Sequence, residues 1–313
     1  MKFIMYHYVR PSHPDLPYFK HLHIDDFRRQ LDYFAAEYGF VPRDEFLATL
    51  EGTAVPVSGV VLSFDDGLID HYRYVLPELE QRNLWGLFYI PTGIYARRKL
   101  LDVHRIHCLL GRFGGQAMLD ALGELVSDDM LSHSHVDEFR ERTYARQDND
   151  AATAEFKRIL NYYLSYEFRE QVLDTLMARF FCEEELIDEY YIPRDRLAEF
   201  EERQMLLGGH SVSHRVFSRL SRAEQQHEIQ ECFEFLESAT GGLKLRSFCY
   251  PYGGFHSFNA TTEELLQAAG CRFSLNVEPR DAEAADFRTR PQAIPRYDCN
   301  AFPYGRCREP LAV

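Results

Sequence analysis

Two pairs of side chains in the sequence have the residue types and the spacing of a site for metal-assisted hydrolysis. Asp65 and Asp66 occur in LSFDDG, which follows the apolar segment GVV. Adjacent carboxylates repel one another unless a cation or a hydrogen-bond donor pairs with them. His210 and His214 occur in GGHSVSH, a spacing that brings two imidazoles together on a helical turn. Two histidines and one carboxylate leave positions on an ion open to water, as in hydrolytic zinc sites. One aspartate would bind the ion, and the other would act as a base.

Each pattern alone has an ordinary structural explanation. An Asp-Asp-Gly sequence after a strand is more often a strand-to-helix turn with an N-cap aspartate, and exposed histidines four positions apart are more common than metal ligands. Both patterns, however, follow segments that are typical of buried strands. The carboxyl ends of parallel strands meet on one face, so we expect the two pairs to lie together there, with the YPYGG loop at residues 250–254.

The elements that must position these residues alternate between strand and helix. Period-two and short apolar patterns predict strands in seven segments: 2–9, 57–64, 85–93, 204–210, 245–250, 271–277 and 293–299. Apolar residues at helical spacing predict helices between them: 24–39, 71–83, 223–242 and 261–270. This alternation indicates an α/β fold built from parallel βα units, in a doubly wound sheet or a barrel.

The pattern changes from about residue 98 to residue 200. Almost no strand signal occurs there, and five segments have helical spacing. Since the βα pattern resumes afterwards, we interpret this stretch as a helical insertion in a single domain that spans residues 1–313. Long connections between barrel elements often carry function, so the insertion is expected to lie beside the site and to influence substrate choice.

Composition excludes several classes of partner. The net charge of −14 argues against binding to nucleic acid or to an anionic membrane surface, and no apolar run approaches the roughly 20 residues that span a bilayer. The N-terminal segment has no pattern of a secretory signal. The seven cysteines are odd in number and form no C-x-x-C, which is typical of thiols in a reducing compartment. We therefore expect a cytoplasmic protein.

Three motifs together resemble a known family. LSFDDG, GGHSVSH and FCYPYGG, in this order, resemble the leading motifs of polysaccharide deacetylases of carbohydrate esterase family 4, the NodB-homology domain, as do YHYV near the start and FYIPTG after the first motif. The resemblance covers nearly the whole chain except the insertion. It implies a distorted (β/α)7 barrel and metal-dependent removal of N- or O-acetyl groups from sugars, and thus a hydrolase acting on C–N bonds other than peptide bonds.

The resemblance also implies roles for individual residues. Asp65 corresponds to the general base, Pro251 and Tyr252 to the wall of the substrate groove, and the backbone N–H near Tyr252 to a donor that holds the oxyanion. A divalent cation, with Zn²⁺ as the expected ion, would be bound by three residues: Asp66, His210 and His214.

The chain departs from the family pattern at two positions. Cys249 stands where the family usually has an arginine that orients the base, and Arg296 in IPRYD is the candidate to pair with Asp65 instead, a structural salt bridge elsewhere being the alternative. The family also has a late histidine that protonates the leaving amine, but no histidine follows His256 here. His7, at the end of the first expected strand, is the preferred candidate for the acid. His256 is the second candidate, and a histidine that only packs or contacts substrate is the alternative for both.

The leading hypothesis is a cytoplasmic deacetylase whose substrate is a nucleotide- or lipid-linked sugar precursor of a surface polysaccharide, such as a capsule or a lipopolysaccharide. A second hypothesis keeps the site but changes the acyl group, for example to formyl, or the substrate to a non-sugar amide. A third, suggested by the missing late histidine, is a catalytically reduced barrel that binds a glycan. The complete set of ligand residues argues against the third hypothesis.

Overall fold

The computed structural model describes residues 1–131 and 149–308, so residues 132–148 of the predicted insertion lie outside the described residues. The chain forms two compact units. The first unit comprises three stretches: Met1–Pro11, His21–Arg98 and Asp188–Arg308. The described part of the second unit comprises Ser12–Lys20 and the stretch Lys99–Ile187 without residues 132–148.

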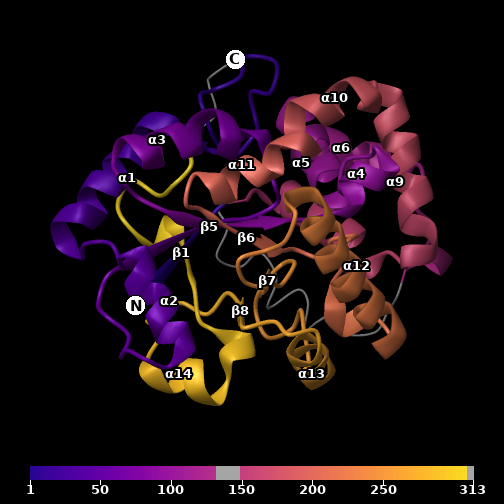
Figure 1. Cartoon of the computed structure of the whole chain (residues 1–313). Coiled ribbons are helices and arrows are strands. Elements are labelled where there is room, and N and C mark those ends of the chain that lie inside the picture. Colours follow the sequence, from indigo (N-terminus) through magenta and orange to yellow (C-terminus); the bar gives the residue numbers. More distant parts are fainter. Residues whose placement is uncertain (132–148, 309–313) are drawn as a thin grey trace. The chain divides into compact units, whose positions relative to one another are not determined.

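The first unit is built on a sheet in which every neighbouring pair of strands is parallel (Figure 1). Its order is β8-β7-β6-β5-β4-β1-β9. The seven strands are β1 (Lys2–Tyr6), β4 (Val60–Phe64), β5 (Gly86–Ile90), β6 (Leu206–Gly209), β7 (Ser247–Cys249), β8 (Phe273–Leu275) and β9 (Tyr297–Asp298). Two further short strands, β2 (Val9–Arg10) and β3 (Leu22–His23), pair with each other. The predicted distorted (β/α)7 barrel is confirmed.

The sheet curves until β1 and β8, which lie near its two edges, approach one another. Phe46 contacts the rings of Phe3 on β1 and Phe273 on β8, at centroid distances of 6.0 and 5.6 Å. The last segment spans the remaining gap, because Ile294 pairs with β8 at Leu275 whereas Tyr297 pairs with β1. Residues 295 and 296 therefore lie where the chain crosses from one side of the barrel to the other.

Helices of the first unit lie between successive strands (Figure 1). They are α1 (Ile24–Glu37), α2 (Arg43–Glu51), α3 (Leu76–Gln81), α4 (Gly93–Arg97), α11 (Leu197–Glu202), α12 (Arg222–Thr240), α13 (Ala260–Ala268) and α14 (Ala284–Thr289). A π-helical turn, His71–Val75, precedes α3. Helix α12 begins with a capping box between Ser221 and Glu224, which satisfies N–H groups of its first turn.

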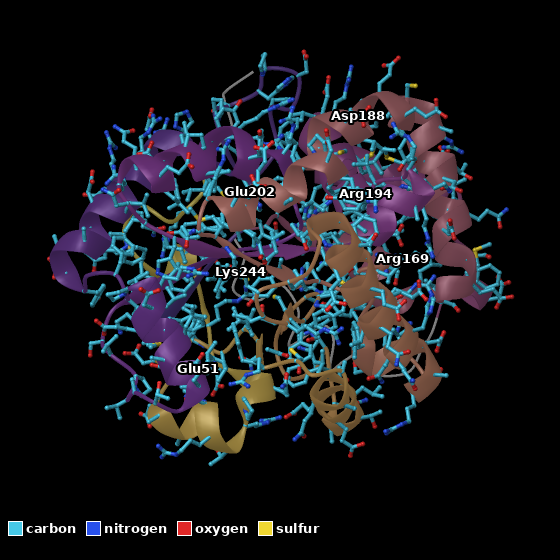
Figure 2. All side chains as sticks on the ribbon, in the orientation of Figure 1. Glu51, Arg169, Asp188, Arg194, Glu202 and Lys244 are labelled. Carbon is cyan, nitrogen blue, oxygen red and sulfur yellow. The ribbon has the colours of Figure 1, made fainter. Side chains whose placement is uncertain are left out.

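Alternation along the strands decides which side chains enter the barrel. On β4, Leu62 and Phe64 pack with the surrounding helices, whereas Val61 joins the apolar cluster of the interior. Asp65 lies four positions after Val61, and side chains an even number of positions apart lie on the same face, so the Asp65 side chain also points into the barrel. Charged side chains such as Glu51 and Glu202 lie on the outside (Figure 2).

The second unit is mainly helical in the residues that the structure describes. Its helices are α5 (Asp102–Phe113), α6 (Gly115–Gly123), α8 (Ala151–Arg158) and α9 (Tyr166–Phe180), while α10 (Glu183–Tyr190) runs across the boundary between the units. Arg105 is buried in this unit and forms ion pairs with Glu183 and Asp174 at 2.6 and 2.8 Å. Among the described helices of the chain, none has the length and apolar character to span a membrane.

Candidate active site

The polar residues singled out in the sequence follow the carboxyl ends of neighbouring strands. Asp65 and Asp66 come directly after β4, and His210 comes directly after β6. Cys249 is the last residue of β7, and His7 comes directly after β1. Because all these strands are parallel, their ends lie at one edge of the sheet, and the side chains converge there.

Three ligand-type atoms meet at this edge. Asp66 Oδ1 lies 3.3 Å from His210 Nε2 and 3.2 Å from His214 Nε2, and all three side chains are buried. Ligand atoms about 2.0–2.1 Å from a tetrahedral zinc ion stand about 3.3 Å from one another. The observed separations therefore fit a cation bound by Asp66, His210 and His214, with carboxylate and imidazole donors that suit Zn²⁺.

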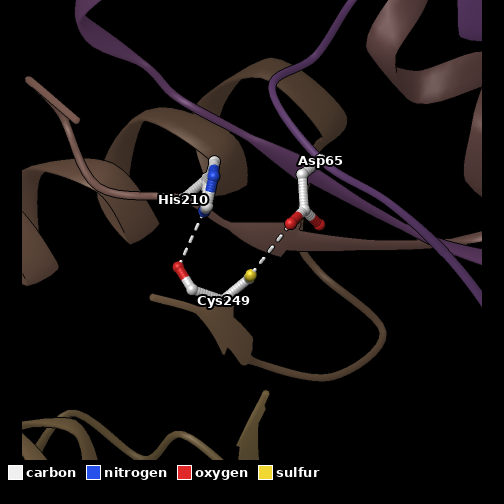
Figure 3. Close-up of side chains that lie close together, drawn as sticks. All are labelled: Asp65, His210 and Cys249. Atoms are coloured by element: carbon white, nitrogen blue, oxygen red, sulfur yellow. Dashed lines mark hydrogen bonds between the residues drawn. The ribbon is translucent and has the colours of Figure 1, made fainter. Parts of the chain in front are cut away.

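A backbone carbonyl orients one of the two imidazoles. His210 Nδ1 lies 2.7 Å from the carbonyl oxygen of Cys249, as Figure 3 shows. The carbonyl can only accept, so Nδ1 carries a proton and donates it. This hydrogen bond fixes the ring with Nε2 facing Asp66, the orientation in which Nε2 would bind a cation.

His214 reaches the site from a tight loop and not from the helical turn that the spacing predicted. Ser211 and His214 have φ angles of 65° and 55°, and Ser211 Oγ accepts a hydrogen bond of 2.9 Å from the His214 N–H. Asp66 also has a positive φ, of 78°. Side-chain-bearing residues seldom adopt this region, so two of the three candidate ligands stand on strained backbone, as is common at functional sites.

Asp65 is held by the guanidinium of Arg296. Arg296 donates through both terminal nitrogens, at 2.8 Å to each carboxylate oxygen, and both side chains are almost fully buried. The thiol of Cys249 lies 3.3 Å from Asp65 Oδ2 (Figure 3) and 3.0 Å from Arg296. Burial alone would raise the pKa of the Asp65 carboxyl, but Arg296 and His210 outweigh it and lower that pKa to about 2. Asp65 is therefore an ionised carboxylate at neutral pH.

His7 stands at the exposed border of the site. Its Nε2 lies 3.9 Å from Asp66 Oδ2, and its side chain is 42% exposed. Its backbone carbonyl accepts a hydrogen bond of 2.8 Å from the buried imidazole of His71, which the sequence patterns did not single out. Burial lowers the pKa of His71 to about 4, so this imidazole is neutral and can fix the backbone at His7.

The loop after β7 brings Tyr252 to the histidines. The Tyr252 ring lies 5.1 Å from the His214 ring between centroids, and Tyr252 has a φ angle of 66°. Gly253 has a φ of 58°, and a Cβ there would meet Val277 Cγ2 at 2.2 Å, so the loop requires glycine at this position. Pro251, in the same loop, is buried. The ring of His256 packs on Gly254, where a Cβ would lie 3.1 Å from it.

One sequence-distant residue also reaches the histidine loop. Glu228 of α12 is buried and accepts hydrogen bonds from the backbone N–H groups of Val212 and Ser213, both at 2.8 Å. Sequence reasoning missed Glu228 because α12 contains many polar residues. The one sequence feature that could have indicated Glu228 is that it occupies a position on the buried face of this helix.

Comparison with known proteins agrees with this geometry. Residues 168–274 match the family model of polysaccharide deacetylase, a span that includes His210, His214 and the loop around Tyr252. No curated protein matches the chain significantly.

Solved structures share the fold at low sequence identity. A Streptococcus pyogenes deacetylase, PplD, in complex with acetate has a TM-score of 0.58 and 15% identity, over 95% of this chain and 91% of that one. IcaB from Ammonifex degensii has a TM-score of 0.55 and 17% identity, over 95% and 90%. A polysaccharide deacetylase from Bacillus cereus, BC0361, has a TM-score of 0.53 and 10% identity, over 95% of this chain and 64% of that one.

The resemblance that the three motifs predicted is thereby supported over residues 168–274, which match the polysaccharide deacetylase model. Over 95% of its length the chain also shares the fold of solved deacetylase structures.

Proposed function

We propose that the protein is a metal-dependent deacetylase that hydrolyses an N- or O-acetyl group on a sugar. The observation that carries this proposal is the convergence of Asp66, His210 and His214, at separations that suit one ion, beside the buried carboxylate of Asp65. When bound, a divalent cation such as Zn²⁺ would polarise the acetyl carbonyl and make a water molecule more acidic.

Asp65 is proposed as the base that takes the proton from the attacking water. A carboxylate offers about four acceptor positions, and three are used by two N–H groups of Arg296 and the Cys249 thiol. One position on Oδ1 is left for the water. With its pKa of about 2, Asp65 stays ionised at neutral pH and accepts a proton only from a water that is already acidified.

Arg296 is proposed to orient the base in place of the arginine that the family has at position 249. The small Cys249 side chain leaves the guanidinium of Arg296 room to lie against Asp65 from the opposite side of the barrel. The bidentate geometry supports this role, because a fork of two parallel hydrogen bonds fixes the carboxylate plane as well as its charge.

The leaving amine needs a proton, since expulsion of an amide anion is prohibitive. We propose His7 as the acid, because its imidazole lies at the border of the site, 3.9 Å from Asp66 and partly open to solvent. Tyr252 and Pro251 are proposed as the wall of the substrate groove, with the backbone N–H near Tyr252 donating to the oxyanion, and His256 as a substrate contact or the second candidate for the acid.

The substrate is proposed to be a nucleotide- or lipid-linked sugar in the cytoplasm, as a precursor of a surface polysaccharide. The seven cysteines, all within the described part of the chain, form no disulfide, and four of them are buried. Such cysteine usage is typical of a reducing compartment.

Acetate release tests the proposed function. Purified protein, stripped with a chelator and reloaded with Zn²⁺, is incubated with nucleotide-linked N-acetylglucosamine, with N-acetylglucosamine oligomers and with the matching N-formyl compounds. We expect metal-dependent acetate release, faster from the nucleotide-linked sugar. Release of formate only would favour the other acyl group, and binding of the oligomers without turnover would favour a glycan-binding barrel.

A further inference from the structure

Glu228 is a buried carboxylate whose observed hydrogen-bond partners all lie on the loop that carries His214. Its Oε2 accepts from the N–H groups of Val212 and Ser213, each at 2.8 Å, and its Oε1 accepts from the Ser213 hydroxyl at 2.5 Å. Within the described ranges, no ion pair joins Glu228 to a lysine, arginine or histidine. A buried carboxylate is costly unless donors or a positive charge stabilise it, so its position needs an explanation.

The loop that Glu228 contacts would not hold its shape by local preference. Ser211 and His214, with φ angles of 65° and 55°, stand on either side of the two N–H groups. The opposite side of the loop is fixed by the start of α4, because the Ser211 and Val212 carbonyls accept hydrogen bonds of 3.0 and 2.9 Å from the N–H groups of Thr92 and Gly93. A Cβ at Gly93 would lie 2.4 Å from the Val212 carbonyl oxygen, so this approach is close.

These contacts hold the His214 loop between two elements that are distant in sequence. Glu228 fixes the N–H side and residues 92–93 fix the carbonyl side, so the strained backbone of the loop is determined from both directions. A hydrogen bond to an ionised acceptor is stronger than a neutral one, which makes the carboxylate the tighter of the two attachments.

We propose that Glu228 is a positioning residue for the metal centre, acting through Val212 and Ser213 on the placement of His214. The inference rests on the proposed metal site. Groups that orient metal ligands without contacting the ion typically change metal affinity by about 10–100-fold when they are removed.

Three variants of Glu228 distinguish the effect of its hydrogen bonds from the effect of its charge. Glu228→Gln keeps the length of the side chain, and its amide oxygen can accept from both N–H groups while its NH₂ donates to Ser213 Oγ. Glu228→Asp keeps the charge but withdraws the carboxylate by one methylene. Glu228→Ala removes the contacts, and Glu231→Ala, at an exposed position of the same helix, is the matched control.

The affinities for Zn²⁺ are measured by competition with a chelator, and the coordination geometry by the visible absorption spectrum of the Co²⁺-loaded protein. We expect Glu228→Ala to weaken Zn²⁺ binding about 10–100-fold and to change the Co²⁺ spectrum. Glu228→Asp should fall between Ala and the wild type, and Glu228→Gln and Glu231→Ala should stay within about threefold of the wild type. A purely structural role would lower the melting temperature of the metal-free protein but leave both readouts of the folded variants unchanged.

Unchanged affinity and spectrum in Glu228→Ala would overturn the inference, and so would a Glu228→Gln variant that binds metal as weakly as Glu228→Ala. If Glu228→Ala does not fold, Glu228→Asp decides, since wild-type affinity and spectrum in that variant would contradict the positioning role. A wild-type protein that binds neither Zn²⁺ nor Co²⁺ would refute the proposed metal site itself. Metal binding that is normal in the wild type and in every variant would refute the role of Glu228 alone.

Discussion

Arg296 and Asp65 form a bidentate ion pair in the interior of the barrel, with both N···O distances at 2.8 Å. The two residues are 231 positions apart in the chain. They meet because Asp65 directly follows β4 with its side chain pointing into the barrel. Arg296 lies where the final segment crosses from β8 to β1. The pair therefore depends on closure of the barrel and joins its first half to its last segment.

Replacement of Arg296 by glutamine should destabilise the fold and raise the pKa of Asp65, because burial of the carboxylate then acts without a cation. Removal of one partner of a buried pair costs about 3–5 kcal/mol in the free energy of unfolding. The native pKa of Asp65, about 2, lies below its unfolded value, so the pair's contribution is present above pH of about 4 and is lost as pH falls towards 2. The deficit of Arg296→Gln should accordingly shrink in acid.

Urea denaturation at pH 7 and pH 3 measures this difference, and Arg280→Gln, which removes a partly exposed bidentate pair with Asp286, is the control. The acid limb of kcat/KM should also move to higher pH in Arg296→Gln, since the base must be ionised to act. An unmoved acid limb in a folded Arg296→Gln enzyme would show that Asp65 is not the group that the limb reports.

Asp65→Asn should abolish most of the activity without loss of metal. Asparagine keeps the shape of the side chain but cannot accept the proton, so the rate should fall by about 10²–10⁴. Metal content, measured on the same preparation, should equal that of the wild type because both carboxylate oxygens of Asp65 pair with Arg296, whereas the proposed ligands are Asp66, His210 and His214. A rate within a few-fold of the wild type would assign the base to another group.

His71 should make the protein less stable in mild acid. Its native pKa of about 4 is below the unfolded value of about 6.5, so the unfolded chain binds a proton first as pH falls. The group costs nothing above pH of about 6.5 and removes about 2 kcal/mol between there and pH 5. His71→Gln, which can still donate to the His7 carbonyl, should flatten this part of the stability profile. The exposed His227→Gln should not, and an identical slope in His71→Gln would contradict the prediction.

His7→Gln should lower the rate of acetate release about 10²–10⁴-fold, with metal binding unchanged. The reason is that glutamine cannot protonate the leaving amine, whereas the histidine proposed for this step can. His256→Gln is the matched variant, because His256 is the other histidine proposed for this step. If only His256→Gln loses the rate, the acid lies in the loop after β7.

Sequence patterns predicted the strands and the residues at their ends because both signals are local. The run GVVLSF has the apolar character of β4, and the aspartates follow it directly. Helix α2 is absent from the prediction because only Phe46 and Thr49 of its nine residues are buried, which leaves a weak apolar pattern.

Contacts set by the closed barrel could not be predicted in the same way. The spacing of His210 and His214 predicted that they lie together on a helical turn. Both rings do lie beside Asp66, but their loop is non-helical and is held by Glu228 and by residues 92–93 from other elements. Arg296 could be proposed as a partner of Asp65 only from its place at a late strand end. Asp65 and Arg296 both contact Cys249, the last residue of β7. No local sequence pattern indicates that β7 lies near the segment that contains Arg296.

The central claim is that Asp66, His210 and His214 hold the ion on which acetate release depends. Metal content and acetate release are measured on one preparation each of the wild type, His214→Ala and the control His227→Ala, after removal of metal and titration with Zn²⁺. The wild type and the control should bind one equivalent and release acetate in proportion to it, whereas His214→Ala should lose both together. Full metal retention in His214→Ala, or acetate release from the wild type that is independent of added metal, would contradict the account.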